Sequence, residues 1–250
     1  MCYPHPMNDP LINIVNASAG YNGEIVLKNI NLKVFNRDFV GVIGPNGGGK
    51  TSLLKLILGL LKTKSGNITY AKDIKIGYLP QQSFIDSKFP ISVKEVLLSG
   101  LQNKGRFFTS FSKMEINLLE KTLHQLGIEN IADKPIGELS GGQRQRAFIG
   151  RAIISNPRLL LLDEPNTFVD QRLEKELFEI LIELNKTMAI LVVSHDVGMI
   201  SSKVKTIACV NLTLHYHPSS EITNEVLQSY DCPIDLITHG TVPHRVLKNH

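Results

Sequence analysis

The sequence predicts an α/β fold in which helices alternate with buried strands and a group of helices is inserted in the middle of the chain. Residues 39–43, 159–162 and 190–193 are short runs of apolar side chains, typical of strands buried on both faces. Leucines at helical spacing follow the first run, and a charged helical stretch, 170–185, separates the other two. Strands and helices that alternate in this way favour a parallel sheet.

The N-terminal part adds a half-buried strand and the first helix. Apolar and polar side chains alternate over residues 30–35, which predicts a strand with one mainly apolar face. Leucine and isoleucine then recur at helical spacing from Lys50 to Leu61, so a helix is expected there. The sequence Ser-Gly-Asn at 65–67 consists of turn-forming residues, and we expect it to end this unit.

Two helix-start signals mark the middle third of the chain. The sequences SVKE, beginning at Ser92, and SKME, beginning at Ser112, match the capping box, in which a hydroxyl and a carboxylate satisfy free amides at a helix start. Helices are therefore expected near 93–101 and 113–126, and Gly127 should stop the second.

Composition and charge narrow the classes of function. The chain has 250 residues, 42% hydrophobic and 20% charged, with a net charge of +4. It contains no block of like charge, so nucleic acid is not an expected partner. Cys2, Cys209 and Cys232 are far apart and form no CxxC pair, which favours a reducing compartment over a disulfide framework. We see no secretory signal and no apolar run long enough to span a bilayer, so we expect any membrane part to come from another chain.

A glycine-rich motif joins the strand at 39–43 to the first helix. Its letters, GPNGGGKT, satisfy GxxxxGK[ST] in the strand–helix context that a phosphate-binding P-loop requires. Glycines let successive backbone amides turn toward a phosphate, and the helix N-terminus adds positive potential. We expect Lys50 to reach the β- and γ-phosphates of a nucleotide and the Thr51 hydroxyl to bind Mg²⁺. The residues expected to hold the nucleotide here are Gly44, Pro45, Asn46, Gly47, Gly48, Gly49, Lys50, Thr51 and Ser52.

Two carboxylates follow the buried run 159–162 directly. Ligands of open α/β sheets bind at the carboxyl ends of the strands, where Asp163 suits a role toward Mg²⁺. Glu164 is placed to polarise a water for attack on the γ-phosphate. A strand that ends in Asp-Glu is common by itself, but the upstream P-loop favours the catalytic interpretation.

The sequence Leu-Ser-Gly-Gly-Gln at 139–143 is a second candidate anion site. It contains a capping box that opens another helix, so an ordinary helix cap would also explain it. A serine hydroxyl, two bare glycine amides and a helix N-terminus together suit a phosphate. The residues of this candidate site are Ser140, Gly141, Gly142 and Gln143.

LSGGQ is the defining sequence of the ATP-binding cassette (ABC) ATPases, and the chain resembles that family over nearly its whole length. The resemblance implies a P-loop NTPase (RecA-like) core with an antiparallel β subdomain and an inserted α-helical subdomain. It implies one domain, 8–250. Within it, the RecA-like and β lobe covers about 8–82 and 155–211, the helical lobe about 83–154, and the tail about 212–250.

Further site residues are implied by the resemblance alone. Tyr21 matches the aromatic that stacks on adenine, and Gln81 matches the glutamine that senses Mg²⁺ and the γ-phosphate. Asp170 matches the aspartate of the loop after the catalytic glutamate, and His195 matches the histidine that contacts the γ-phosphate. The implied catalytic residues are Glu164, His195 and Gln81, and the implied ligands of the Mg²⁺ of Mg-ATP are Thr51, Gln81 and Asp163.

The resemblance also implies partners and a location. Two copies would meet head-to-tail, so that Ser140 of one closes over the ATP held by Lys50 of the other. The pair would drive transmembrane permease subunits at the cytoplasmic face of a bacterial membrane, with an extracytoplasmic substrate-binding protein as an indirect partner.

The C-terminal tail bears on the cargo. Its segments 232–236 and 239–245 resemble the branch of the family that imports zinc, manganese or iron. Histidines gather in the tail and, with one cysteine, suit either a metal site or simply a polar tail: His215, His217, Cys232, His239, His244 and His250.

Four alternatives to metal import differ in how well the sequence fits them. An importer of another solute, such as an iron chelate, and a soluble ABC ATPase of iron–sulfur cluster assembly both stay open. A chromosome-type ATPase does not fit, because no coiled coil separates Lys50 from Leu139. Glu164 and His195 together argue against a binding module without catalysis.

Overall fold

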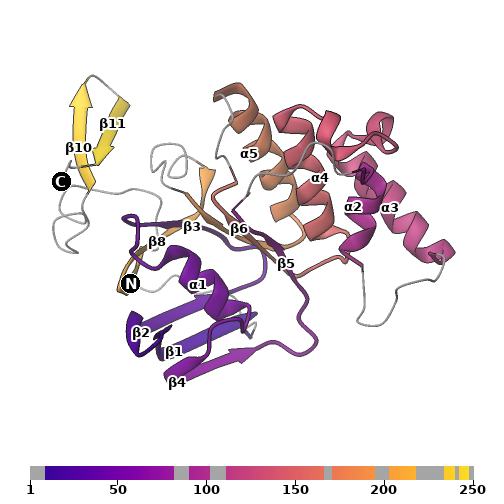
Figure 1. The fold of residues 1–250 in the computed structure, drawn as a ribbon. Helices are drawn as coiled ribbons and strands as arrows, with labels where there is room; N and C mark the ends of the chain where they lie inside the picture. Colours follow the sequence, from indigo (N-terminus) through magenta and orange to yellow (C-terminus); the bar gives the residue numbers. More distant parts are fainter. Residues whose placement is uncertain are drawn as a thin grey trace.

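A computed structural model gives the fold. It describes residues 9–81, 90–101, 111–165, 171–194, 203–217, 234–239 and 242–247. The predicted α/β fold is confirmed, because helices lie against both faces of a largely parallel sheet (Figure 1). Among these residues, no helix has the length and hydrophobicity that crossing a membrane requires.

The central sheet has the strand order β5-β6-β7-β3-β8-β9. Its strands run parallel except β9, which pairs antiparallel with β8. All three apolar runs predicted as buried strands are confirmed, because β3, β6 and β7 are buried along their whole length. The strand bounds are Phe39–Ile43 (β3), Ile76–Leu79 (β5), Leu159–Asp163 (β6), Ala189–Val193 (β7), Thr206–Asn211 (β8) and Thr213–His217 (β9).

A second, antiparallel sheet has the order β2-β1-β4, with β1 at Ile12–Tyr21, β2 at Glu24–Val34 and β4 at Thr63–Tyr70. The expectation that residues 65–67 end a unit is wrong, because they lie inside β4. Gly66 has a φ of +78° beside an irregular register of β1, and a Cβ there would lie 2.2 Å from the carbonyl oxygen of Asn16. The glycine therefore serves a close strand contact and not a turn.

The helices follow the predicted starts closely. The capping boxes at Ser92, Ser112 and Ser140 are confirmed, each with both of its hydrogen bonds. The first helix is shorter than expected, because it ends before Gly59, whose φ is +70°. The helix bounds are Lys50–Ile57 (α1), Val93–Ser99 (α2), Lys113–Leu126 (α3), Gly141–Ile153 (α4) and Gln171–Asn185 (α5). Two 3₁₀ turns, Glu129–Ile131 and Ile136–Glu138, precede α4.

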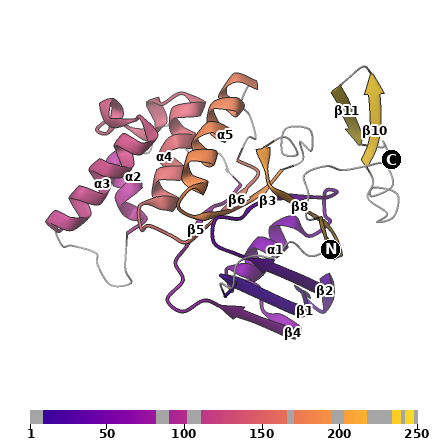
Figure 2. The same ribbon diagram turned by 180° about the vertical axis from the view of Figure 1, so that it is seen from behind.

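Two hydrophobic cores lie on opposite faces of the central sheet. Successive side chains of β6 alternate between them, so Leu160 joins the core under helices α2–α5 and Leu161 joins the core under α1 and the antiparallel sheet. Figures 1 and 2 show helices α2–α5 on one side of the central sheet and α1 with the antiparallel sheet on the other. A hairpin of β10 (Ile234–His239) and β11 (Val242–Leu247) follows later in the chain. The predicted division into lobes at 82/83 and 154/155 stays a prediction.

A candidate nucleotide site at the carboxyl edge of the sheet

The P-loop is a tightly supported turn between β3 and α1. Gly49 is the N-cap of α1 with a φ of +100°, and it makes no side-chain cap bond. A Cβ on Gly44 would lie 2.0 Å from the carbonyl oxygen of Val210, and one on Gly49 would lie 2.9 Å from that of Val26. Only glycine fits both places. The first amides of α1 therefore have no side-chain cap and suit an anion.

Lys50 is folded back over the P-loop. Its side-chain Nζ donates to the carbonyl oxygens of Gly44 at 2.9 Å and Pro45 at 3.0 Å, and the residue is only 6% exposed. Burial lowers the pKa of Lys50, while the negative charges of Glu164 and Asp163 oppose that shift. A cation is thus held within the loop, close to two carboxylates.

Asp163 is the buried acceptor of this edge. It is 1% exposed, and its Oδ1 accepts a hydrogen bond from the Thr51 hydroxyl at 3.2 Å. Burial raises the pKa of Asp163, an effect that the Thr51 hydrogen bond counteracts and the charge of Glu164 reinforces. Tyr78 of β5 lies beside it: burial, with the charge of Asp163 and a hydrogen bond to it, raises the pKa of Tyr78 to about 12.

Glu164 is held in an unusual conformation next to Gln81. Its φ is +46°, a left-handed value that costs a residue other than glycine about 1–3 kcal/mol. Its backbone amide donates to the carbonyl oxygen of Val193 at 3.1 Å. Its Oε2 accepts from the Gln81 Nε2 at 2.7 Å. The structure therefore brings together the two side chains that were predicted to act on water and γ-phosphate.

The Ser140 sequence lies on a different element, at the start of α4. Ser140 and Gly141 are exposed, whereas Gly142 is buried where a Cβ would lie 2.9 Å from the Leu173 side chain of α5. The Ser140 hydroxyl accepts from the amide of Gln143 at 3.3 Å. The start of α4 thus faces solvent at Ser140 and Gly141 and packs against α5 at Gly142.

The remaining predicted residues lie on other elements or outside the described residues. Tyr21 ends β1, is 42% exposed, and has its ring centroid 5.9 Å from the Lys55 Nζ of α1. Asp170 and His195 lie outside the described residues, as do Cys232 and His250. His215 and His217 lie on β9, His239 on β10 and His244 on β11. Within the ranges that the structure describes, no group of three or more His, Cys, Asp or Glu residues suits a metal ion.

The sequence interpretation missed three supporting residues. Tyr78 was not among the predicted site residues, although β5 lies directly beside β6. Leu212, with a φ of +59°, donates its amide to the Gly48 carbonyl at 3.2 Å and accepts from the Lys28 amide at 2.6 Å. Gln145 is buried, and its side-chain amide donates to the Pro165 carbonyl. The contacts of Leu212 are made by its backbone, so no pattern of side chains in the sequence predicts them.

Taken together, the fold and this edge define a P-loop nucleotide-binding protein. Comparison with known families and proteins is in agreement. Residues 27–167 match the ABC transporter family. The zinc uptake system ATP-binding protein ZurA of Listeria innocua is 39% identical over 84% of this chain and 86% of that protein. A metal transport system ATP-binding protein of Thermotoga maritima is 36% identical over 92% and 94%. The zinc import ATP-binding protein ZnuC of Pasteurella multocida is 33% identical over 83% and 75%.

Solved structures agree with these relatives. The ATPase fold is shared with a protein assigned to the metal-chelate type of ABC transporters, in an inward-facing conformation. The TM-score is 0.82 at 25% identity, and the match covers 97% of this chain and 98% of that one. A nucleotide-free ATP-binding cassette has a TM-score of 0.79 at 24% identity, with 89% and 97% covered. The chain belongs to the ABC transporter family, which establishes it as an ATP-binding, ATP-hydrolysing subunit and implies transmembrane permease partners.

Proposed function

We propose that this ATPase powers the uptake of a divalent metal ion, Zn²⁺, Mn²⁺ or Fe²⁺, through its permease subunits at the cytoplasmic face of a bacterial membrane. The juxtaposition of Lys50, Thr51, Asp163, Glu164 and Gln81 at one sheet edge supports the ATPase mechanism. The metal cargo is supported by relatives named for zinc uptake and metal transport that match most of the chain.

The residues that we assign to ATP fit its charge. Amides at the start of α1 face the phosphates, and Lys50 exchanges its contacts with the Gly44 and Pro45 carbonyls for phosphate oxygens. The exposed ring of Tyr21 is assigned to adenine stacking. The full set assigned to the nucleotide comprises Tyr21, Gly44, Pro45, Asn46, Gly47, Gly48, Gly49, Lys50, Thr51 and Ser52, and Ser140, Gly141, Gly142, Gln143 and Asp170 of the dimer contact.

Oxygen donors at this edge also fit Mg²⁺. The Thr51 hydroxyl and the Asp163 carboxylate are hydrogen-bonded together, and Gln81 brings its amide side chain to the same edge. Asp163 is a buried carboxylate whose raised pKa reflects poorly compensated charge, and a cation would compensate that charge. A Mg²⁺ ion held by these residues would supply positive charge to the phosphates of ATP.

Glu164 is the proposed general base. Its carboxylate accepts a proton from the attacking water while the Gln81 amide holds the carboxylate in place. His195 is assigned to the γ-phosphate by family position only. Because Ser140 and Gly141 face solvent at a helix start, we assign them to the ATP held by a second, head-to-tail copy. A substrate-binding protein outside the membrane would deliver the cargo to the permease.

The catalytic assignment is tested with Glu164→Gln. This variant should bind ATP with near wild-type affinity, hydrolyse it at least about 100-fold more slowly, and accumulate as an ATP-bound dimer. Size-exclusion chromatography with ATP and a phosphate-release assay measure both effects. Glu183→Gln, on the exposed face of α5, is the matched control and should behave as wild type. A Glu164→Gln protein that stays monomeric with wild-type turnover would contradict the assignment.

The cargo is tested with the permease complex in vesicles. After co-purification with its membrane partner, the chain should drive ATP-dependent uptake of at least one of Zn²⁺, Mn²⁺ and Fe²⁺, and Lys50→Ala should abolish it. Uptake of an iron chelate instead would overturn the metal-ion cargo while keeping the importer. Co-purification with soluble assembly proteins and no permease would point to iron–sulfur cluster assembly.

A further inference from the structure

The helix that begins at Ser140 is tied to the strand end that carries Glu164. Gln145, on the second turn of α4, is 5% exposed, and its side-chain Nε2 donates to the backbone carbonyl of Pro165. Pro165 is itself buried and directly follows Glu164. The bond thus joins the start of α4 to the end of β6 within one chain. In the proposed dimer, these two elements serve different ATP molecules.

The place of this bond gives it consequences for Glu164. Glu164 occupies a left-handed conformation, and its own amide is held by the Val193 carbonyl. The Gln145 bond fixes the peptide group on the other side, at Pro165. The backbone is therefore held before and after the residue whose carboxylate meets Gln81. A shift of α4 along its axis would pull directly on this anchored segment.

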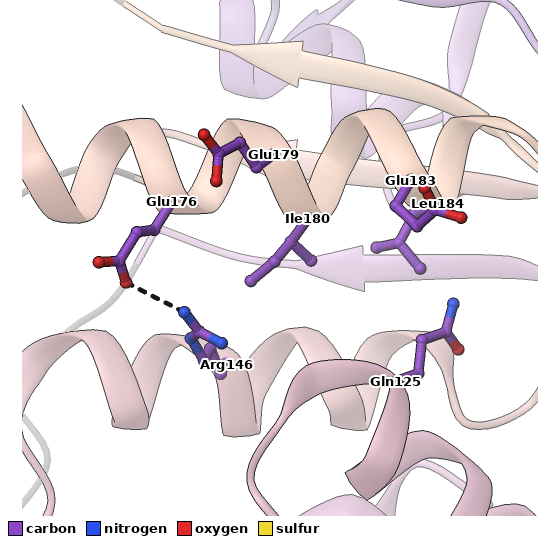
Figure 3. Close-up of a pocket in the computed structure, with 7 residues that line it drawn as sticks. All are labelled: Gln125, Arg146, Glu176, Glu179, Ile180, Glu183 and Leu184. Atoms are coloured by element: carbon purple, nitrogen blue, oxygen red, sulfur yellow. Dashed lines mark hydrogen bonds and ion pairs between the residues drawn. The ribbon is translucent and has the colours of Figure 1, made fainter.

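Arg146, the residue after Gln145 on α4, makes a different set of contacts. Figure 3 shows the pocket lined by residues of α3, α4 and α5, in which Arg146 and Glu176 form an ion pair at 3.0 Å. Arg146 also donates to the Leu126 carbonyl at the end of α3, at 2.9 Å. These contacts hold α4 against neighbouring helices and do not include the strand end. They provide a comparison between general packing of α4 and the specific link through Gln145.

We propose that Gln145 is a positioning residue that couples the two ATP sites of the head-to-tail dimer. This coupling rests on the proposed function, because it requires Ser140 of each chain to contact the ATP held by the other chain. When Ser140 is seated on that ATP, the Gln145 link places the Pro165 peptide, and with it Glu164, for hydrolysis in its own chain. The link also acts in the opposite direction. When the segment after β6 is ordered, the Gln145 bond holds α4 in the position at which Ser140 contacts the ATP of the other copy.

Mixed dimers with one working site test the coupling. One copy carries Lys50→Ala, so that only the other copy binds ATP productively, and differently tagged copies are isolated by sequential affinity purification. Gln145→Met keeps the length of the side chain and removes the donor. Placed in the ATP-binding copy or in the Lys50→Ala copy, it should lower turnover at the single site by about tenfold, the factor of one lost hydrogen bond. ATP affinity of the isolated chain should stay unchanged.

The control and the outcomes separate the possibilities. Glu176→Gln removes the ion pair of α4 with α5 and should leave turnover within about twofold in either copy. If Gln145→Met slows hydrolysis only from the ATP-binding copy, Gln145 serves its own Glu164 and the coupling is overturned. If neither placement matters while the dimer hydrolyses ATP, the positioning role itself is overturned. If the wild-type chain hydrolyses ATP as a monomer, the dimer of the proposed function fails first, and the coupling fails with it.

Discussion

Single residues at the site hold charge and conformation that folding alone does not favour. Asp163 keeps a carboxylate at 1% exposure, and Glu164 keeps a left-handed backbone. Lys50 is nearly buried and satisfied by carbonyl oxygens of its own loop. In the proposed function, these groups are prearranged for the charges of Mg-ATP, and they reduce the stability of the chain while ATP is absent.

Replacement of Asp163 by asparagine should stabilise the ligand-free chain. Because burial raises the pKa of Asp163, the folded state binds its proton more tightly than the unfolded chain does. The stability from this group is therefore present below the unfolded pKa and lost as pH rises through the folded one. At neutral pH, Asp163→Asn should raise the free energy of unfolding by about 1 kcal/mol and abolish ATP hydrolysis.

Urea unfolding without ATP, at neutral and at acidic pH, checks this prediction. The gain should shrink as pH falls toward the range in which the wild-type carboxyl binds its proton. Asp9→Asn, at an exposed carboxylate, is the control and should change stability little. A gain that grows on acidification would contradict the role given to burial.

At the scale of elements, the turn between β8 and β9 supports the P-loop. Leu212 bridges Gly48 and Lys28 through its backbone, and the carbonyl of Val210 closes the space beside Gly44. The phosphate-binding loop is thus backed by a turn that lies far along the chain. Its shape therefore depends on β8 and β9 as well as on its own glycines.

Proline at position 212 should damage the site from a distance. Proline fixes φ near −65° and has no N–H, so Leu212→Pro cannot keep φ at +59° or donate to Gly48. It should cost about 3 kcal/mol of stability and weaken ATP binding about tenfold. Leu212→Gly keeps the amide and accepts the conformation, so its ATP affinity should match wild type. Thermal unfolding and titration with a fluorescent ATP analogue measure both; wild-type affinity in the proline variant would contradict the supporting role.

Elements with strong local signals were predictable, and contacts through the backbone were not. The capping boxes at Ser92 and Ser112 placed the starts of α2 and α3 at the correct residues, because the side chains that specify them are adjacent in sequence. β4 is mostly exposed, so it carries no alternating pattern, and Gly66 in it was taken for a turn. Gln145 lies in a helix that was predicted, but its partner Pro165 belongs to another element, which no local pattern reveals.

In the molecule as a whole, one sheet separates two cores and carries the proposed nucleotide site at a single edge. Side chains of β6 pack in both cores, so the strand that carries Asp163 is held by packing on both of its faces. The site draws on the P-loop, the end of β6 and Gln81 after β5. Ligand binding at such an edge stabilises the elements of both cores together.

ATP should therefore raise the unfolding temperature of the whole chain in one transition. At 100 times the dissociation constant the gain is about 2.7 kcal/mol, provided that the unfolded chain does not bind. In Glu164→Gln with ATP, the midpoint should also rise with protein concentration, because a dimer is then the bound form. Differential scanning calorimetry over a range of protein concentrations measures this, with Lys50→Ala as the control that should show no gain. A midpoint independent of concentration would contradict the dimer.

The backbone at Glu164 also bears on how such a chain can change through mutation. A chain selected only for stability would carry glycine or asparagine where φ is +46°, since both accept that conformation at little cost. Substitution of either at position 164 should relax the backbone while removing the carboxylate that Gln81 holds. The same substitutions should therefore raise stability and abolish catalysis. At position 164, selection for stability alone would convert the enzyme into a protein that binds nucleotide without hydrolysing it, and only selection for turnover opposes this change.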